Sequence, residues 1–251
     1  MQVINWNESN LDFLSSQTGI SIGSFDGLHK GHRVLLNSLV QHCKKNNLKS
    51  GVVTFYRPLP SIKHSSDYAG DISTLKQRLE LFENVGIDFV ILVDFDNDFA
   101  QLKGIEFLSL LVKKYNMCFL AEGVDFRCGY KGATDSTAIQ FWAKQNKIDC
   151  IFVDPVYYND ERISSSYIRQ MIQKGFFSTV CELLERPFEL DLETIKQSGN
   201  TQVLPPDGKY SVKDEKNELQ RIKIQNGMLT DFPSVKKVVF LNFFLGANLF
   251  G

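Results

Sequence analysis

Residues 19–40, GISIGSFDGLHKGHRVLLNSLV, run from an apolar segment through a short glycine-containing segment into an amphipathic one. The apolar run 19–25 is typical of a buried strand, and the leucines after residue 34 recur at helical spacing. The positive end of the helix dipole disfavours cations at a helix start by roughly 0.3 to 1 kcal/mol each. Four basic side chains nevertheless stand there: His29, Lys30, His32 and Arg33.

The turn before this helix has the features of a phosphate-binding loop. Gly27 and Gly31 let the backbone turn tightly and approach a ligand. The N–H groups at a helix start bind phosphate well, and a bound polyanion would make the nearby cations favourable. One alternative stays open at this point, because His29 and His32 with Asp26 also match a metal site of two histidines and one carboxylate.

Outward from this turn, short apolar runs alternate with longer amphipathic runs. This βαβ order favours a mostly parallel sheet with helices on both faces, and such sheets bind ligands at the carboxyl ends of their strands. The segment 24–33 lies at that end of the first predicted strand. The predicted strands are 19–25, 50–55, 88–93, 117–123 and 149–154, and the helical patterns between them include 35–43, 75–82, 107–112 and 139–143.

The pattern changes near Arg186. Two further helical segments, 165–175 and 177–185, precede short runs joined by Gly, Pro and Asn turns, which indicate a few antiparallel strands. We therefore predict an α/β domain with a parallel sheet over 1–186 and a small β-rich segment over 187–251.

The composition is that of a globular protein without a general electrostatic preference. Hydrophobic residues make up 43% of the 251 residues, far from the composition of a disordered chain. Lys and Arg number 28 against 29 Asp and Glu, so the balance does not favour nucleic acid or an anionic membrane as a partner. Any anion site must therefore be local.

Cysteine use and the first residues favour a cytoplasmic protein. The five cysteines are odd in number, far apart and without a C-x-x-C pair, which is typical of reduced core thiols. The start, MQVINWNESN, lacks a charged region followed by an apolar one, so we expect no secretory signal. The most apolar stretch, 238–250, is shorter than the ~20 residues that cross a bilayer, and we interpret it as a strand and tail.

A second cationic helix start is predicted at 164–169, SSSYIR. Its serines can cap the helix, and Arg169 can grip two phosphate oxygens at once. The plainer interpretation is that Ser165 is only a cap and that Arg169 is a solvated surface residue.

Taken in order, several motifs resemble those of the bacterial FAD synthetases. GSFDGLHKGH at 23–32 is similar to the family signature GNFDGVHxGH, and HKGH within it matches the HxGH motif of the wider nucleotidyltransferase superfamily. VVTF at 52–55, GVDFRCG at 123–129 and RISSSYIR at 162–169 resemble further family motifs. The resemblance spans about residues 18–188 and implies a Rossmann-like nucleotidyltransferase domain.

This resemblance implies an enzyme that transfers the AMP part of ATP to FMN, with Mg²⁺, giving FAD and pyrophosphate. The phosphate of FMN is a monoester with a second pKa of about 6, so it is largely dianionic at neutral pH and can attack without a general base. Positioning and charge stabilisation then remain as the main catalytic tasks.

The resemblance also implies roles for particular residues, and it assigns no protein side chain to a metal. The residues with catalytic roles are His29, His32 and Arg169. Those around ATP and its phosphates are Gly23, Ser24, Phe25, Asp26, Gly27, Gly31, Ser164 and Ser165. Those on the flavin side are Gly123, Asp125, Phe126 and Arg127.

Three departures from the family pattern bear on function. Leu59 stands where the family has a histidine, and Cys128, expected to be a buried thiol, stands where a Phe is common. LPPDGKYSV at 204–212 resembles a strand of the riboflavin kinase barrel, but no P-T-A-N motif follows the first domain. We therefore expect no phosphorylation of riboflavin, and a degenerate segment that covers the main domain or mediates self-association.

Two other functions stay open. The chain can be another HxGH transferase with a different phosphorylated acceptor, such as phosphopantetheine, nicotinamide mononucleotide or glycerol phosphate, although the DFR and SSxxIR elements oppose this. It can also be a non-catalytic flavin- or nucleotide-binding protein. The altered loop at Leu59 favours that possibility, and the intact His29, His32 and Arg169 oppose it.

Overall fold

The computed structural model describes residues 1–7, 16–58 and 68–241, and the chain divides into two compact units. The first unit holds residues 1–25, 31–59 and 79–155, and the second holds residues 26–30, 60–78 and 156–251. The compact units divide the later part of the chain after Pro155. The domains 1–186 and 187–251, with a boundary near Arg186, stay a prediction. Leu59 and the apolar tail from residue 242 onward lie outside the described residues.

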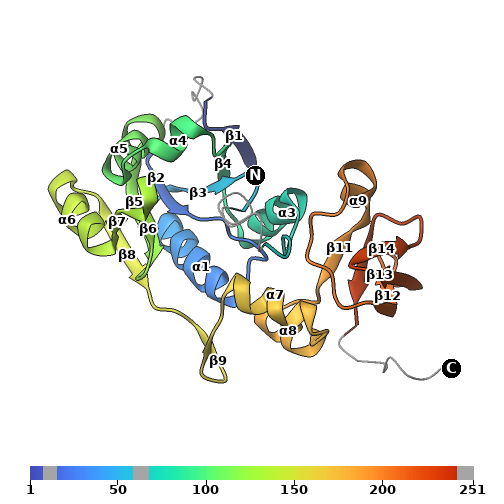
Figure 1. Cartoon of the computed structure of the whole chain (residues 1–251). Coiled ribbons are helices and arrows are strands. Elements are labelled where there is room, and N and C mark those ends of the chain that lie inside the picture. The colour runs from blue at the N-terminus through green and yellow to red at the C-terminus, as the bar shows by residue number, and fades with distance from the viewer. Residues whose placement is uncertain (8–15, 59–67, 242–251) are drawn as a thin grey trace. The chain divides into compact units, whose positions relative to one another are not determined.

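The first unit is built on a six-stranded sheet, drawn in blue to yellow-green in Figure 1. Every pairing in it is parallel, in the order β1-β4-β3-β2-β5-β8, which confirms the predicted parallel sheet. The central strands are buried on both faces, which explains their continuous apolar sequences. The strands are β1 (Gln2–Asn5), β2 (Thr18–Ile22), β3 (Lys49–Phe55), β4 (Phe89–Val93), β5 (Met117–Gly123) and β8 (Asp149–Val153).

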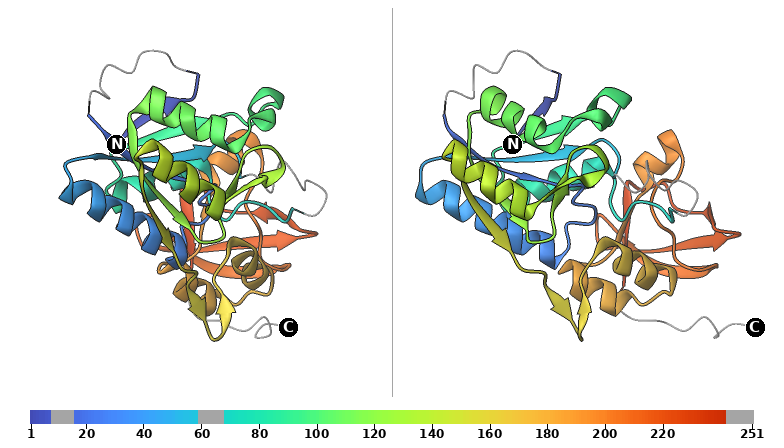
Figure 2. Two further views of the ribbon diagram at one scale, coloured as in Figure 1. Left: turned by 90° about the vertical axis from the view of Figure 1, so that its left-hand side faces the viewer. Right: turned by 60° about the vertical axis from the view of Figure 1, so that its left-hand side comes forward.

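Helices cover both faces of this sheet, as Figure 2 shows. The apolar sides of α5 and α6 join the main core on one face. On the other face α1 comes so close to β2 that a Cβ on Gly19 would meet the Cys43 Sγ at 2.5 Å. The helices that lie wholly or mostly in this unit are α1 (Lys30–Lys45), α3 (Leu75–Val85), α4 (Asn97–Gln101), α5 (Gly104–Tyr115) and α6 (Ser136–Asn146). A short strand pair, β6 (Arg127–Cys128) and β7 (Thr134–Asp135), precedes α6.

The second unit combines helices with a five-stranded sheet whose pairings are antiparallel, in the order β11-β15-β12-β13-β14. This sheet confirms the predicted β-rich C-terminal segment. A single apolar core joins α7 and α8 to the sheet. The elements are β9 (Tyr157–Tyr158), β10 (Glu161–Arg162), α7 (Ser165–Gln173), α8 (Phe177–Leu184), β11 (Glu189–Asp191), α9 (Leu192–Ser198), β12 (Gly208–Asp214), β13 (Leu219–Gln225), β14 (Met228–Asp231) and β15 (Lys237–Phe240).

All five predicted strands of the α/β part and the predicted helices are present, with shifts of a few residues at their ends. The elements that were not predicted include β1, α4 and α9 and the two-residue strands β6, β7, β9 and β10. Among residues 1–7, 16–58 and 68–241, the helices are all too short or too polar to span a bilayer.

Candidate active site

The segment Asp26–Lys30 forms a tight turn at the start of α1, within the second unit, and is buried from Asp26 to His29. Gly27 and Leu28 both have positive φ, of 77° and 38°. A Cβ on Gly27 would lie 2.8 Å from the Ile72 side chain, so both conformation and space require glycine there. Leu28 is fully buried and anchors the turn despite its unfavourable backbone angle.

The carboxylate of Asp26 is the polar centre of this turn. It accepts hydrogen bonds from the Ile72 N–H at 3.0 Å, from the Ser73 N–H at 3.0 Å and from the Ser73 hydroxyl at 3.2 Å. It also forms an ion pair with Arg169, and only 2% of Asp26 is exposed. A carboxylate can be buried this deeply because donors and an opposite charge surround it.

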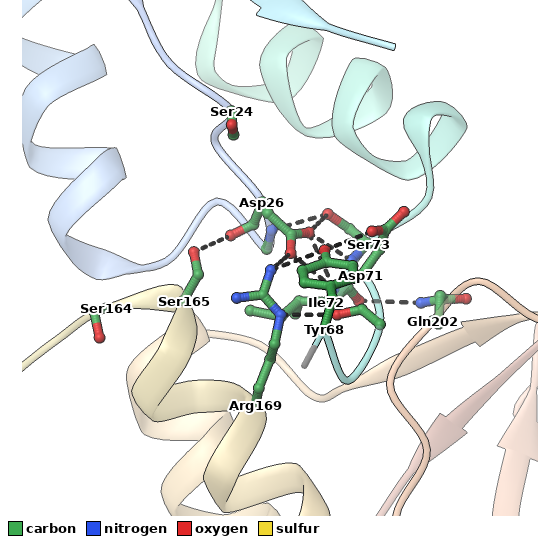
Figure 3. A network of polar contacts seen from close by, with 12 residues as sticks. Ser24, Asp26, Tyr68, Asp71, Ile72, Ser73, Ser164, Ser165, Arg169 and Gln202 are labelled. Carbon is green, nitrogen blue, oxygen red and sulfur yellow. Dashed lines mark hydrogen bonds and ion pairs between the residues drawn. The ribbon is translucent and has the colours of Figure 1, made fainter. Parts of the chain in front are cut away.

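Arg169, from the second turn of α7, completes this buried network (Figure 3). Its Nε donates to the Gly70 carbonyl at 2.8 Å, and its Nη2 donates to Asp26 and, at 3.0 Å, to the Tyr68 hydroxyl. Arg169 is 7% exposed, so the interpretation of it as a solvated surface residue is wrong. Among the described residues, the structure records no hydrogen bond from Nη1 of this guanidinium.

The start of α7 is tied to the same turn. Ser164 is the N-cap residue, and its hydroxyl accepts from the Tyr167 N–H at 3.2 Å. The Ser165 hydroxyl instead donates to the backbone carbonyl of Asp26 at 3.0 Å (Figure 3). Ser165 is therefore not the cap, and it joins the second cationic helix start to the first, as expected if both serve one ligand.

His29 is buried in the same turn, with 6% of the residue exposed. Burial, followed by the positive charges of Arg162 and Arg186, lowers its pKa from 6.5 to about 4. Arg186 is held in place because its Nη2 donates to the Gly27 carbonyl at 2.7 Å. Besides Arg169, the second unit thus places the guanidinium groups of Arg162 and Arg186 near the buried imidazole of His29.

Sequence reasoning missed Arg162 and Arg186, although a signal was available. Arg162 stands directly before the serine-rich helix start, and Arg186 follows the next helix. Basic residues that flank a candidate phosphate motif are natural additions to it.

Sequence reasoning also missed Tyr68 and Asp71. The Tyr68 hydroxyl donates to Asp71 at 2.6 Å, and burial raises the pKa of Asp71 to about 6.

Five of the predicted nucleotide-site residues lie in the first unit. Gly23 closes the end of β2 by donating its N–H to the Val53 carbonyl at 3.0 Å, and the Ser24 carbonyl accepts from the Thr54 hydroxyl at 3.3 Å. The five residues are Gly23, Ser24, Phe25, Gly31 and His32. The rings of Phe25 and His32 meet edge to face, with their centroids 5.2 Å apart.

The predicted flavin-side residues follow β5 in the first unit. Phe126 donates its N–H to the Gly123 carbonyl at 2.9 Å, which makes a tight turn, and Asp125 is exposed on it. Arg127 is also exposed, and its Nε donates to the Gly132 carbonyl at 2.8 Å. Cys128 is buried, as predicted, and burial raises its pKa to about 12.

In the part of the chain that the structure describes, no group of three His, Cys, Asp or Glu side chains could hold a metal ion. The metal alternative for this turn requires the Asp26 carboxylate as a ligand. That carboxylate is already engaged by Arg169 and by the segment at Ile72 and Ser73. The geometry therefore suits an anion better than a cation.

Comparison with known proteins identifies the family. The model of the FAD synthetase family matches residues 14–167, more than half of the chain. The chain belongs to the FAD synthetase family. This chain is 34% identical over 173 residues to the bifunctional riboflavin kinase/FMN adenylyltransferase of Escherichia coli K12, and the match covers 68% of this chain and 55% of that protein.

Two other similarities differ in coverage. A protein named FAD synthetase from Listeria monocytogenes is 26% identical over 194 residues, and the match covers 76% of this chain and 79% of that protein. A crystal structure of a macrolide-efflux protein from Streptococcus pneumoniae has a TM-score of 0.76 at 22% identity and covers 96% of this chain and 98% of that one. That likeness shows the fold alone. The chain spans 55% to 59% of the length of the bifunctional relatives from Escherichia coli and Buchnera aphidicola (Schizaphis graminum).

Proposed function

We propose that this chain transfers the adenylyl group of ATP to FMN. A phosphate oxygen of FMN attacks the α-phosphorus of ATP, the bond from that phosphorus to the bridging oxygen breaks, and pyrophosphate leaves as FAD forms. The FMN phosphate brings its own negative charge, so the protein needs to orient the reactants and stabilise charge on the phosphates.

The observation that carries this proposal is the cationic turn in a member of the FAD synthetase family. His29 lies buried under the electrostatic influence of Arg162 and Arg186, in the turn whose Asp26 carbonyl accepts a hydrogen bond from Ser165 of α7. A triphosphate there would offset the two arginines and favour a protonated, hydrogen-bonding imidazole. The same anion would reverse the unfavourable placement of cations at the start of α1.

We assign the remaining roles by family resemblance and by what each residue has available. His29 and His32 would hold the phosphates of ATP during attack. Arg169 would grip the departing β- and γ-phosphates through Nη1, since Nε and Nη2 already donate to Gly70, Asp26 and Tyr68. The residues proposed to line the nucleotide are Gly23, Ser24, Phe25, Asp26, Gly27, Gly31, Ser164 and Ser165, and those proposed for the flavin are Gly123, Asp125, Phe126 and Arg127.

Mg²⁺ belongs to the proposal as a companion of ATP. It usually keeps several waters and binds through substrate phosphates with only one or two carboxylates. That mode of binding needs no dedicated group of protein ligands. The proposal also places the chain in the cytoplasm, where ATP and reduced thiols are found.

Incubation of the whole chain with ATP, Mg²⁺ and FMN tests the proposal, with FAD and pyrophosphate both measured. We expect both products in equal amounts, and a loss of roughly a hundredfold to a thousandfold in rate for His32→Ala, since this is the usual effect of removing one charge-stabilising donor. His42→Asn, in the last turn of α1, is the matched control and should keep its rate. Pyrophosphate formed only with another phosphorylated acceptor, or FMN and ATP binding without turnover, would overturn the proposal.

We also propose that these 251 residues lack riboflavin kinase activity. Support comes from the sequence of 187–251, which contains no P-T-A-N motif although 204–212 resembles a kinase strand. Riboflavin supplied with ATP and Mg²⁺ should yield no FMN, whereas FMN supplied in its place should yield FAD. Detection of FMN from riboflavin would contradict this part of the proposal.

A further inference from the structure

The segment Gly70–Thr74, GDIST, has contacts on two sides within the second unit. Toward the turn at Asp26, the N–H groups of Ile72 and Ser73 both donate to the Asp26 carboxylate at 3.0 Å. The Gly70 carbonyl accepts from Arg169 Nε at 2.8 Å. This segment therefore sets the position of both members of the buried ion pair.

The other side of the segment is held by the residues around Gln202. Asp71 donates its N–H to the Thr201 carbonyl at 2.7 Å and accepts from the Val203 N–H at 2.8 Å, as in a short parallel ladder. The approach is so close that a Cβ on Gly70 would lie 2.6 Å from the Val203 nitrogen. The C-terminal part of the chain is thus joined to the segment by backbone hydrogen bonds.

The side chain of Gln202 strengthens this junction. It is 2% exposed, and its Nε2 donates to the carbonyls of Ile72 at 3.0 Å and Glu189 at 2.9 Å and to Gln77 Oε1 at 3.2 Å. Its Oε1 accepts from the Asp191 N–H at 2.8 Å. The Ile72 carbonyl consequently accepts from Gln202, and the Ile72 N–H donates to Asp26 (Figure 3).

We propose that Gln202 is a positioning residue for the Asp26–Arg169 pair, a role that rests on the proposed adenylyl transfer. Gln202 fixes the position of the Ile72 carbonyl and thereby that of the Ile72 N–H in the same residue. This N–H holds the Asp26 carboxylate, which in turn holds the Arg169 guanidinium. A glutamine is needed because its amide both donates and accepts, whereas a glutamate has no N–H and a methionine has neither group. A misplaced Arg169 would hold the departing pyrophosphate poorly.

A variant of matched shape separates positioning from folding. Gln202→Met should lower kcat for FAD formation by about 10- to 100-fold, the size of loss that a displacement of about 1 Å causes, while KM for FMN stays within about twofold of its wild-type value. Gln220→Met is the matched control. The Gln220 amide, on β13, donates to Asp214 of β12 at 2.9 Å within the five-stranded sheet, away from this segment. The control should keep its wild-type kcat.

A double-mutant cycle tests whether Gln202 acts through Arg169. Arg169→Lys combined with Gln202→Met should be no slower than Arg169→Lys alone, because the position of a lost guanidinium no longer matters. If Gln202→Met does not fold, Gln202→Asn, which keeps a shorter amide, takes its place, and we expect an intermediate loss with the same coupling. An unchanged kcat in a folded variant, or losses that multiply independently, would overturn the inference.

The failure of this inference differs from a failure of the proposed function. A wild-type chain that forms FAD alongside an equally active Gln202 variant overturns the positioning role alone. A wild-type chain that forms no FAD overturns the proposed function. In that case the affinity for inorganic pyrophosphate, measured by calorimetry, tests the positioning role. We expect Gln202→Met to bind pyrophosphate more weakly than the wild-type chain, and equal affinities would overturn the role.

Discussion

His29 is a buried imidazole, and its protonation is coupled to folding. Burial and the charges of Arg162 and Arg186 lower its pKa from 6.5 to about 4. Between these two values the unfolded chain binds a proton that the folded chain does not. The contribution of His29 to stability is therefore fully present above pH 6.5 and is lost as the pH falls through this window, by about 3 kcal/mol at about 1.4 kcal/mol for each pKa unit.

Asp71 acts in the opposite direction over almost the same range. Burial raises its pKa from 3.8 to about 6, so the folded chain binds the extra proton and the contribution of Asp71 falls as the pH rises. A pH profile of the wild-type chain alone would mix the two effects. The comparison must therefore be made against a variant that changes only the histidine.

We predict that the stability difference between the wild-type chain and His29→Asn changes with pH. The wild-type free energy of unfolding, minus that of the variant, should decrease by about 3 kcal/mol between pH 7 and pH 4, because only the wild-type chain loses the histidine contribution. Urea unfolding at a series of pH values measures this. A difference that stays constant across the range would show that His29 titrates normally.

The ion pair between Asp26 and Arg169 is expected to be sensitive to the loss of either partner. Asp26→Ala leaves a buried guanidinium uncompensated and should lower the free energy of unfolding by about 3 to 5 kcal/mol. The control is Glu193→Ala, which breaks the exposed pair of Lys76 and Glu193, 2.6 Å apart, and should barely move the urea midpoint. Equal midpoints for the two variants would contradict the structural importance assigned to the buried pair.

At the scale of elements, the junction of Gly70–Thr74 with Thr201–Val203 depends on one glycine. Gly70 has a φ of 117°, and a Cβ there would lie 2.6 Å from the Val203 backbone nitrogen. Gly227 also has a positive φ, of 67°, but a Cβ there would meet nothing within 4 Å. The two positions share a positive φ, which would strain any other residue, and they differ in the space available for a side chain.

We therefore predict that Gly70→Ala is more destabilising than Gly227→Ala. Both variants carry the strain of an L-residue at positive φ, about 1 to 2 kcal/mol. Gly70→Ala adds overpacking of about 1 to 3 kcal/mol, because the neighbouring atom belongs to the backbone and cannot turn away. Urea unfolding of both variants measures the difference, and a loss in Gly70→Ala no greater than in Gly227→Ala would contradict the close approach.

Local sequence patterns predicted most elements, because apolar runs and helical spacing depend only on neighbouring residues. β2, β3, β4, β5 and β8 follow from such runs. β1 is a short edge strand with a single buried residue, and α9, LETIKQS, has one buried residue and little apolar spacing, so neither produced a signal. α4, NDFAQ, has no buried residue at all.

The candidate site was predictable only in part, for a different reason. His29, Ser164, Ser165 and Arg169 belong to local motifs, and the structure brings them into one unit. The partner of Arg169 is 143 residues away in sequence, and no local pattern encodes such a pairing. The role of Gln202 likewise depends on Ile72, which is 130 residues away.

At the scale of the whole molecule, the second unit has one apolar core that crosses the predicted boundary near Arg186. Phe177 of α8 stacks on Phe240 of β15 with their centroids 4.5 Å apart. The core also joins residues before the boundary to residues after it: Ile72, Ile168, Phe177 and Leu184 on one side and Leu190, Val203, Val212, Ile222 and Phe240 on the other. Residues 187–251 therefore supply part of a shared core, along with the junction at Gln202.

A chain ending at residue 186 should consequently lose the fold of the second unit. Removal of 187–251 would expose the apolar side of α7 and α8 and would free the segment Gly70–Thr74 from its partners. We expect residues 68–78 and 156–186 of the shortened chain to lose protection from hydrogen exchange and to be cut rapidly by proteases, because local stability follows buried contacts. A shortened chain with whole-chain exchange protection in these ranges would instead show that residues 1–186 fold as an independent domain, as the sequence pattern alone predicts.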